Sequence, residues 1–143
     1  MFSEDTVSAP RRTTVSARRY SSTMATFRDL VFALVASVPY GKVTSYGRLA
    51  AALGQPRKAR EVGWALSSIP EELHLNAHRV VNVDGFLSGG WAFGAPEVQR
   101  ALLEDEGVSF LPDGRVDFDR HLWPQDAARA AAERILGQAQ ERG

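Results

Sequence analysis

Residues 44–67 read TSYGRLAAALGQPRKAREVGWALS, and the predicted architecture is built around this stretch. Its apolar spacing favours one short helix over about residues 45–53 and a second over about residues 57–67. Thr44 is a suitable N-cap for the first helix, and Gly54 is suited to the left-handed position that ends it. Two short helices joined by a tight, glycine-containing turn are typical of a helix-turn-helix.

The second predicted helix has a basic start. Pro56 is tolerated where a helix begins, and the first turn contains Arg57, Lys58 and Arg60. The amide groups and the dipole at a helix N-terminus both favour phosphate. We therefore predict that these three side chains bind DNA, with a purely structural helix pair as the alternative.

The zero net charge conceals an uneven distribution, since 17 Lys and Arg balance 17 Asp and Glu. Between Asp29 and Glu61 there is no acidic residue, whereas the C-terminal residues 92–143 contain six basic and ten acidic residues, a net charge of −4. The interval between Asp29 and Glu61 contains five basic residues: Lys42, Arg48, Arg57, Lys58 and Arg60. Such polarity orients a protein on a polyanion, although an ordinary solvated helix face also produces it.

The rest of the sequence predicts a single domain over residues 24–143. Residues 1–23 are rich in Ser, Thr and Arg and lack apolar periodicity, so we expect them to form a disordered tail. From Phe27 to Val38, apolar residues recur with helical spacing. Residues 126–138 are rich in alanine and also predict a helix.

A small β element is expected in the middle of the chain. Residues 79–83 are β-prone and end at a turn formed by residues 84–85. Residues 96–106 predict a helix, and residues 108–110 and 116–118 predict a hairpin. The residues expected to face inward from the 96–106 helix are Val98, Leu102 and Leu103. The expected fold is mainly α with a small β element, a winged-helix-like helix-turn-helix.

The absence of cysteine excludes several kinds of chemistry. Disulfide frameworks, cysteine-based zinc sites and thiol nucleophiles all require that residue. No apolar run approaches the roughly 20 residues that a membrane helix needs. We expect a monomer with no cofactor, no metal and no membrane contact, located in the cytoplasm and associated with the nucleoid if the cell is prokaryotic.

Three motifs together carry a family resemblance. They are VPYGKVTSYG at residues 38–47, PRKAREVG at 56–63 and HRVV at 78–81. In this order and spacing they resemble the DNA-binding C-terminal domain of O6-alkylguanine-DNA alkyltransferases, over about residues 26–107. The resemblance implies a helix-turn-helix that binds the minor groove and flips the damaged base out of the duplex.

The resemblance also implies that this chain lacks the family's nucleophile. Transferases carry a Pro-Cys-His-Arg motif whose thiol accepts the alkyl group, and the cysteine position here is Ala77. A methyl side chain has no lone pair and cannot accept an alkyl group. The chain therefore resembles the alkyltransferase-like proteins, which lack the reactive cysteine. Those proteins usually carry Trp at this position, so Ala77 predicts a roomier pocket.

Several DNA-binding roles follow from the resemblance. Arg60 matches the arginine finger that fills the space left by the flipped base, and Tyr46 matches the tyrosine that rotates the target nucleotide. Arg57 and Lys58 would anchor phosphates. Trp64 stands where transferases have a small residue, and the sequence suggests no role for it.

The resemblance assigns the lesion pocket to another set of residues: Tyr46, Ala77, His78, Arg79 and Ser88. Glu106 matches the glutamate that orients the motif's histidine. Without a thiol to activate, this pair would only hold the pocket wall, by a charge-assisted hydrogen bond. Asn76 replaces the motif's proline.

Three hypotheses follow. The first is a non-catalytic sensor that binds O6-alkylguanine in double-stranded DNA and directs it to nucleotide excision repair proteins. The second is a helix-turn-helix transcription regulator with no lesion preference. The third is an enzyme that uses His78 and Glu106 as a general base, which we disfavour because no nucleophile or metal set accompanies them.

Overall fold

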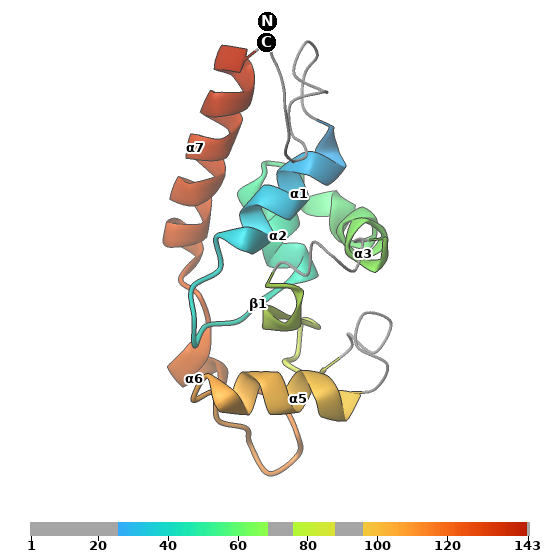
Figure 1. The fold of residues 1–143 in the computed structure, drawn as a ribbon, viewed down its shortest axis with the longest axis vertical. Helices are drawn as coiled ribbons and strands as arrows, with labels where there is room; N and C mark the ends of the chain where they lie inside the picture. Colours follow the sequence, from blue (N-terminus) through green and yellow to red (C-terminus); the bar gives the residue numbers. More distant parts are fainter. Residues whose placement is uncertain (1–25, 69–75, 88–95, 143) are drawn as a thin grey trace, which may run out of the picture.

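The computed structural model describes residues 26–68, 76–87 and 96–142 (Figure 1). In chain order the elements are α1 (Phe27–Ala36), β1 (Thr44–Ser45), α2 (Tyr46–Ala52), the 3₁₀ helix η2 (Pro56–Lys58), α3 (Ala59–Ser67), the 3₁₀ helix η4 (Ala77–Arg79), β2 (Val80–Val81), α5 (Pro96–Asp105), α6 (Phe118–His121) and α7 (Gln125–Arg142). The predicted fold, mainly α with a small β element, is confirmed. The predicted tail over residues 1–23 and the boundary at residue 24 lie outside the described residues.

Helix α1 forms where its apolar stripe predicted. The Thr26 hydroxyl accepts a hydrogen bond from the Asp29 N–H, and the Asp29 carboxylate accepts one from the Thr26 N–H, both at 3.1 Å. This capping box satisfies two backbone donors that the first turn leaves unpaired. The helix buries its apolar face, formed by Val31, Leu34 and Val35.

The predicted helix-turn-helix is formed by α2 and α3. Ser45 caps α2 by accepting a hydrogen bond from the Arg48 N–H at 3.3 Å, so the prediction of Thr44 as N-cap is wrong by one residue. Thr44 is instead the first residue of β1, where it pairs with Val80 of β2. Gly54 has a φ of 79° and takes the left-handed position predicted for it.

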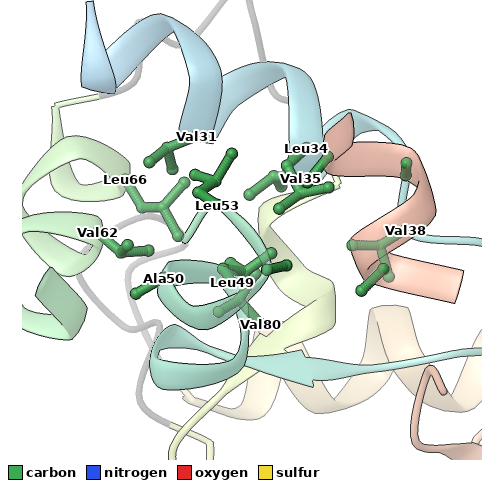
Figure 2. Close-up of a cluster of buried hydrophobic side chains, with 14 of the residues drawn as sticks. Val31, Leu34, Val35, Val38, Leu49, Ala50, Leu53, Val62, Leu66 and Val80 are labelled. Atoms are coloured by element: carbon green, nitrogen blue, oxygen red, sulfur yellow. The ribbon is translucent and has the colours of Figure 1, made fainter. Parts of the chain in front are cut away.

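One apolar core joins these helices (Figure 2). Figure 2 shows side chains from α1, α2 and α3 pointing toward one another, and the largest fully buried ones among them are Leu34, Leu49 and Leu66. Helix α7 adds the small side chains of Ala128, Ala131 and Ala132, which allow it to lie close to α1 and α2. No helix in the described ranges is both long and apolar enough to cross a membrane.

The β structure is smaller than predicted. Strands β1 and β2 pair in parallel, Thr44 with Val80 and Ser45 with Val81. The predicted hairpin over residues 108–118 is reduced to a single antiparallel bridge between Phe110 and Val116. Phe118 is not in a strand because the Asp117 carbonyl accepts backbone N–H groups of the following turn and begins α6.

Helix α5 forms as predicted, but it turns a different face inward. Val98 and Leu102 are 44% and 40% exposed, so their predicted inward position is wrong, whereas Leu103 is fully buried as expected. The second residue on the buried face is Gln99, which is also fully buried. Its side-chain N–H group donates to two backbone carbonyls, those of His78 at 2.9 Å and Val80 at 3.1 Å. The burial of a polar side chain here follows from those two acceptors.

Candidate nucleic-acid interface

The turn before α3 carries two of the predicted DNA contacts. Pro56–Lys58 form η2 and α3 starts only after it, so the prediction of one continuous α-helix is wrong. The Lys58 N–H donates to the Gln55 carbonyl at 3.0 Å, which closes a tighter turn than an α-helix makes. Arg57 and Lys58 therefore lie in a 3₁₀ turn, and Arg60 lies in the first turn of α3.

One face of this turn and helix is exposed and basic. Its members are three or four residues apart, so they share a face, and we call them the α3 stripe: Arg57, Arg60, Trp64 and Ser67. Val62 and Leu66 lie on the opposite, buried face. Within the described residues, the guanidinium groups of the stripe make no hydrogen bond or ion pair. Both cations are thus placed where a phosphate or a base edge could reach them.

Lys58 is arranged differently from its neighbour Arg57. Its Nζ lies 5.1 Å from the centroid of the Phe27 ring, at the start of α1. Such a cation–π contact holds the ammonium group against the protein while leaving it accessible from one side. Of the two predicted phosphate anchors, Arg57 is the more exposed.

Tyr46 lies beside α3. It is the first residue of α2 and packs, half-buried, against the apolar core of α1, α2 and α3. A β-carbon added to Gly63 would lie 3.9 Å from Tyr46 Cδ1, so the tyrosine ring rests against the glycine side of α3. The α2–α3 pair thus brings Tyr46 to the helix that carries Arg60.

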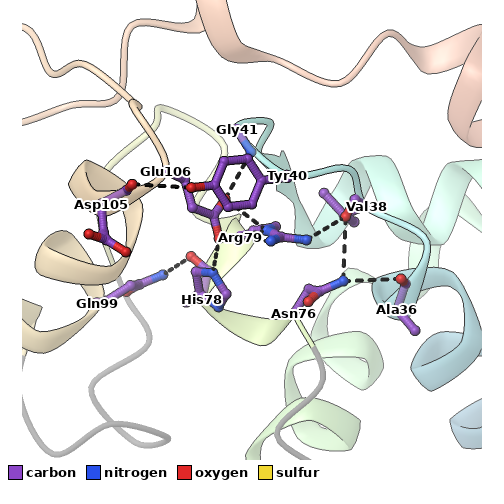
Figure 3. A network of polar contacts seen from close by, with 10 residues as sticks. All are labelled: Ala36, Val38, Tyr40, Gly41, Asn76, His78, Arg79, Gln99, Asp105 and Glu106. Atoms are coloured by element: carbon purple, nitrogen blue, oxygen red, sulfur yellow. Dashed lines mark hydrogen bonds and ion pairs between the residues drawn. The ribbon is translucent and has the colours of Figure 1, made fainter.

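A second group of predicted residues surrounds Glu106 (Figure 3). Glu106 Oε2 lies 2.7 Å from His78 Nε2 and 2.7 Å from Arg79 Nη2, and Oε1 accepts from the Gly41 N–H at 2.8 Å. Arg79 also donates from Nη1 to the Val38 carbonyl at 2.7 Å. We call these residues the Glu106 cluster. It joins the end of α5 to η4 and to the loop after α1.

The cluster holds a carboxylate that is strongly ionised. Burial opposes ionisation of Glu106, but hydrogen bonds from Arg79, His78 and the Gly41 N–H outweigh that cost and lower the pKa of Glu106 from 4.5 to about 2. At neutral pH the carboxylate is an acceptor only, so His78 Nε2 carries the hydrogen between them. A carboxylate with so low a pKa is a weak base.

Ala77, the predicted pocket residue at the cysteine position, is buried, with 5% of its surface exposed. It is the first residue of η4 and lies next in sequence to the Glu106 cluster. On its other side Asn76 Nδ2 donates to the carbonyls of Ala36 at 3.0 Å and Val38 at 3.4 Å. These bonds connect η4 to the end of α1. Ser88, the remaining predicted pocket residue, lies outside the described residues.

Sequence reasoning missed two polar residues that support this region. The sequence marks Asn76 only as a replacement for the motif's proline, and it gives no direct sign of Gln99. Gln99 lies four residues before Leu103, so the two side chains share one helix face. Because Leu103 is predicted to face inward, this spacing is the signal that could have shown Gln99 to be buried. Among the described residues, no group of His, Asp and Glu side chains is arranged to hold a metal ion.

Comparison with known proteins identifies the family. The family described as "6-O-methylguanine DNA methyltransferase, DNA binding domain" matches residues 26–108, from the N-cap of α1 to just beyond α5. The chain belongs to this family. This match confirms the resemblance to alkyltransferases that the sequence predicts. The matched residues 26–108 include both the α3 stripe and the Glu106 cluster. Helices α6 and α7 follow it.

Individual relatives agree with this assignment. The DNA base-flipping protein of Escherichia coli (strain K12) is 42% identical over 100 residues, which cover 68% of this chain and 74% of that protein. Alkyltransferase-like protein 1 of Schizosaccharomyces pombe is 34% identical over 104 residues, which cover 70% of this chain and 96% of that protein. A solved S. pombe relative, crystallised with damaged DNA containing O6-carboxymethylguanine, is similar with a TM-score of 0.60 and 33% identity, covering 68% of this chain and 94% of its own.

Proposed function

We propose that this protein is a non-catalytic sensor of O6-alkylguanine in double-stranded DNA. The observation that carries the proposal is the environment of Ala77. A buried methyl group lies where the family's resemblance puts the acceptor thiol, while the neighbouring His78–Glu106 contact is present at 2.7 Å. The names of the relatives, a DNA base-flipping protein and an alkyltransferase-like protein, support the same function.

The first step is binding to the duplex through the α3 stripe. Arg57 and Arg60 are exposed and have no ion-pair partner among the described residues. A DNA phosphate can therefore bind either guanidinium group without breaking an existing ion pair. Arg57 and Lys58 hold the backbone and determine how strongly binding depends on salt. Following the family's pattern, α3 enters the minor groove, where binding proteins bend and partly unstack the duplex.

The second step is extrusion of the damaged base. An O6 adduct can be inspected in a pocket only after the nucleotide has left the stack, and a damaged base unstacks at lower cost. Tyr46 crowds the phosphate of the target nucleotide from the start of α2, and Arg60 occupies the space that the base leaves. The flipped base lies toward Ala77, with His78, Arg79 and Ser88 as the proposed pocket wall.

The third step of a transferase is absent here. Moving an alkyl group requires a thiolate that forms a new carbon–sulfur bond as the bond to O6 breaks, and the chain has no cysteine. Glu106 is bonded to Arg79 and has its pKa lowered to about 2, so it is also poorly suited to act as a general base near neutral pH. The Glu106 cluster therefore supports the pocket and does no chemistry.

Because the lesion stays intact, a second activity has to remove it. A bent duplex with a displaced base is the kind of distortion that excision systems recognise, and we propose that the bound site is passed to nucleotide excision repair. In this proposal the protein acts as a monomer on one lesion.

The test uses two duplexes that differ only in one O6-methylguanine. We expect the wild-type protein to bind the methylated duplex at least about tenfold more tightly, a difference of about 1.4 kcal/mol. We also expect a label on the methyl group to stay on DNA after prolonged incubation. Equal affinity for the two duplexes would favour the transcription-regulator alternative, and label on the protein would contradict the absence of catalysis.

A further inference from the structure

We propose that Trp64 is an additional DNA-contact residue, which packs its indole against the sugar wall of the groove beside Arg60. This proposal rests on the proposed function, because it takes α3 to be the helix that enters the groove. It assigns a role to a side chain that the comparison with transferases leaves without one.

The first observation is the unusual exposure of this side chain. Trp64 is 62% exposed, whereas Trp123 of the core is 5% exposed. Within the described residues no hydrogen bond or ring contact holds the indole; the backbone carbonyl of Trp64 accepts from the Ser67 hydroxyl at 2.8 Å. A large aromatic side chain left in water marks a surface that a partner covers.

The second observation is its position on α3. Trp64 lies four residues after Arg60, so the two side chains share one face of the helix. The helix rises about 1.5 Å per residue, which separates them by about 6 Å along its axis. Base pairs are about 3.4 Å apart, so Trp64 lies within about two base pairs of the site that Arg60 occupies.

The surroundings of Trp64 indicate what kind of partner covers it. The other members of the α3 stripe are two arginines and a serine. The half-buried Glu61 lies three residues before Trp64, and residues 57–61 keep a net charge of +2, from three basic residues and one acidic residue. The exposed Val98 and Leu102 on α5 differ, because the Arg100–Glu104 ion pair next to them is neutral overall. A cationic stripe with one large apolar side chain matches a DNA groove, which offers phosphates at its edges and apolar deoxyribose on its walls.

The experiment compares wild type, Trp64→Ala, Trp64→Phe and the control Val98→Ala on the plain and methylated duplexes. We expect Trp64→Ala to lower affinity for both duplexes about tenfold, while Trp64→Phe and Val98→Ala stay within about threefold of wild type. The slope of log affinity against log salt concentration should not change in Trp64→Ala, because an indole displaces no counterion.

Tryptophan emission gives a direct second readout. The readout uses a Trp91→Phe background, because Trp91 would also emit and lies outside the described residues. In this background DNA should shield the emission from acrylamide quenching, and adding Trp64→Phe should remove most of that shielding, since the remaining Trp123 is already buried. Circular dichroism and a melting curve on each variant establish that the comparison is made between folded proteins.

The outcomes separate this proposal from the proposed function. If Trp64→Ala binds both duplexes like wild type while wild type prefers the lesion, the Trp64 contact is wrong and the sensor function stands. If wild type shows no lesion preference but Trp64→Ala binds about tenfold more weakly, the contact stands and the sensor function fails. If Trp64→Ala only abolishes self-association of the protein, the indole is an interface between copies and the DNA contact is overturned.

Discussion

Arg79 and Arg60 carry the same guanidinium group in regions that are built in opposite ways. Arg79 is 8% exposed and gives hydrogen bonds to the Glu106 carboxylate and to the Val38 carbonyl. Arg60 is exposed on α3 and has no ion-pair partner among the described residues. Arg79 connects parts of the protein, whereas Arg60 is exposed to solvent, where we propose that DNA contacts it.

The difference lets stability and the proposed DNA binding be tested on separate residues of this fold. A buried cation is tolerated only when its carboxylate and carbonyl partners are all in place, so the Glu106 cluster is sensitive to any single change. An exposed cation contributes little to stability, and it can be changed to test binding alone. The predictions below change one region at a time, beginning with the largest expected effect.

Removing the carboxylate of the cluster should give the greatest loss of stability. Glu106→Ala leaves the Arg79 guanidinium buried without its counter-charge, and we expect about 3–5 kcal/mol less free energy of unfolding in urea titrations. The control is Glu104→Ala, which breaks the exposed Arg100–Glu104 pair and should cost at most about 0.5 kcal/mol. Similar losses in the two variants would show that the Glu106 cluster does not stabilise the fold.

The acid stability of the protein should depend on the same carboxylate. Because folding lowers the pKa of Glu106 from 4.5 to about 2, its stabilisation is complete above pH 4.5 and is lost as the pH falls toward 2. We expect the wild type to lose roughly 3 kcal/mol more than Glu106→Gln over this interval. Parallel stability curves for the two proteins between pH 4.5 and 2 would contradict the assigned pKa.

The periodicity of apolar residues in the sequence correctly predicts the helices whose buried face is entirely apolar. The stripe from Phe27 to Val38 predicted α1, and the helix–Gly54–helix pattern predicted α2 and α3. It failed on α5, where Gln99 replaces an apolar residue on the buried face because two carbonyls from a distant segment need a donor. A requirement set by long-range contacts leaves no periodic signal.

The support that Asn76 gives to η4 should be measurable but smaller. Asn76→Ala removes the hydrogen bonds to the Ala36 and Val38 carbonyls, and we expect a loss of about 1 kcal/mol in unfolding free energy. Asn76→Asp serves as the matched variant, since it keeps the shape but removes the donor. If both variants unfold at the wild-type denaturant concentration, the two bonds do not hold η4 to α1.

The smallest effects on stability are expected in the basic turn. Arg57→Ala should leave unfolding almost unchanged and reduce the slope of log DNA affinity against log salt concentration by about 1. Lys58→Ala should weaken both duplexes alike and also cost about 0.5–1 kcal/mol of stability, because its ammonium lies over the Phe27 ring. Equal stability of the two variants would show that the Phe27 contact contributes nothing.

The candidate site was only partly predictable for a related reason. The proximity of His78 and Glu106 came from the family resemblance, since nothing local connects residues 28 positions apart. The bonds from Arg79 to Glu106 and Val38 exist only once α1, η4 and α5 have packed together. The 3₁₀ turn at Pro56–Lys58 was likewise missed, because a proline at a helix start is compatible with either helix type.

The central claim is that Arg60 confers lesion preference on a protein that otherwise binds DNA by charge. The most direct measurement is the ratio of dissociation constants for plain and O6-methylguanine duplexes, taken at one salt concentration for wild type, Arg60→Ala and Lys58→Ala. We predict that Arg60→Ala brings this ratio close to 1 while Lys58→Ala leaves it at the wild-type value. An Arg60→Ala protein that binds both duplexes more weakly by the same factor, with the ratio intact, would contradict the account.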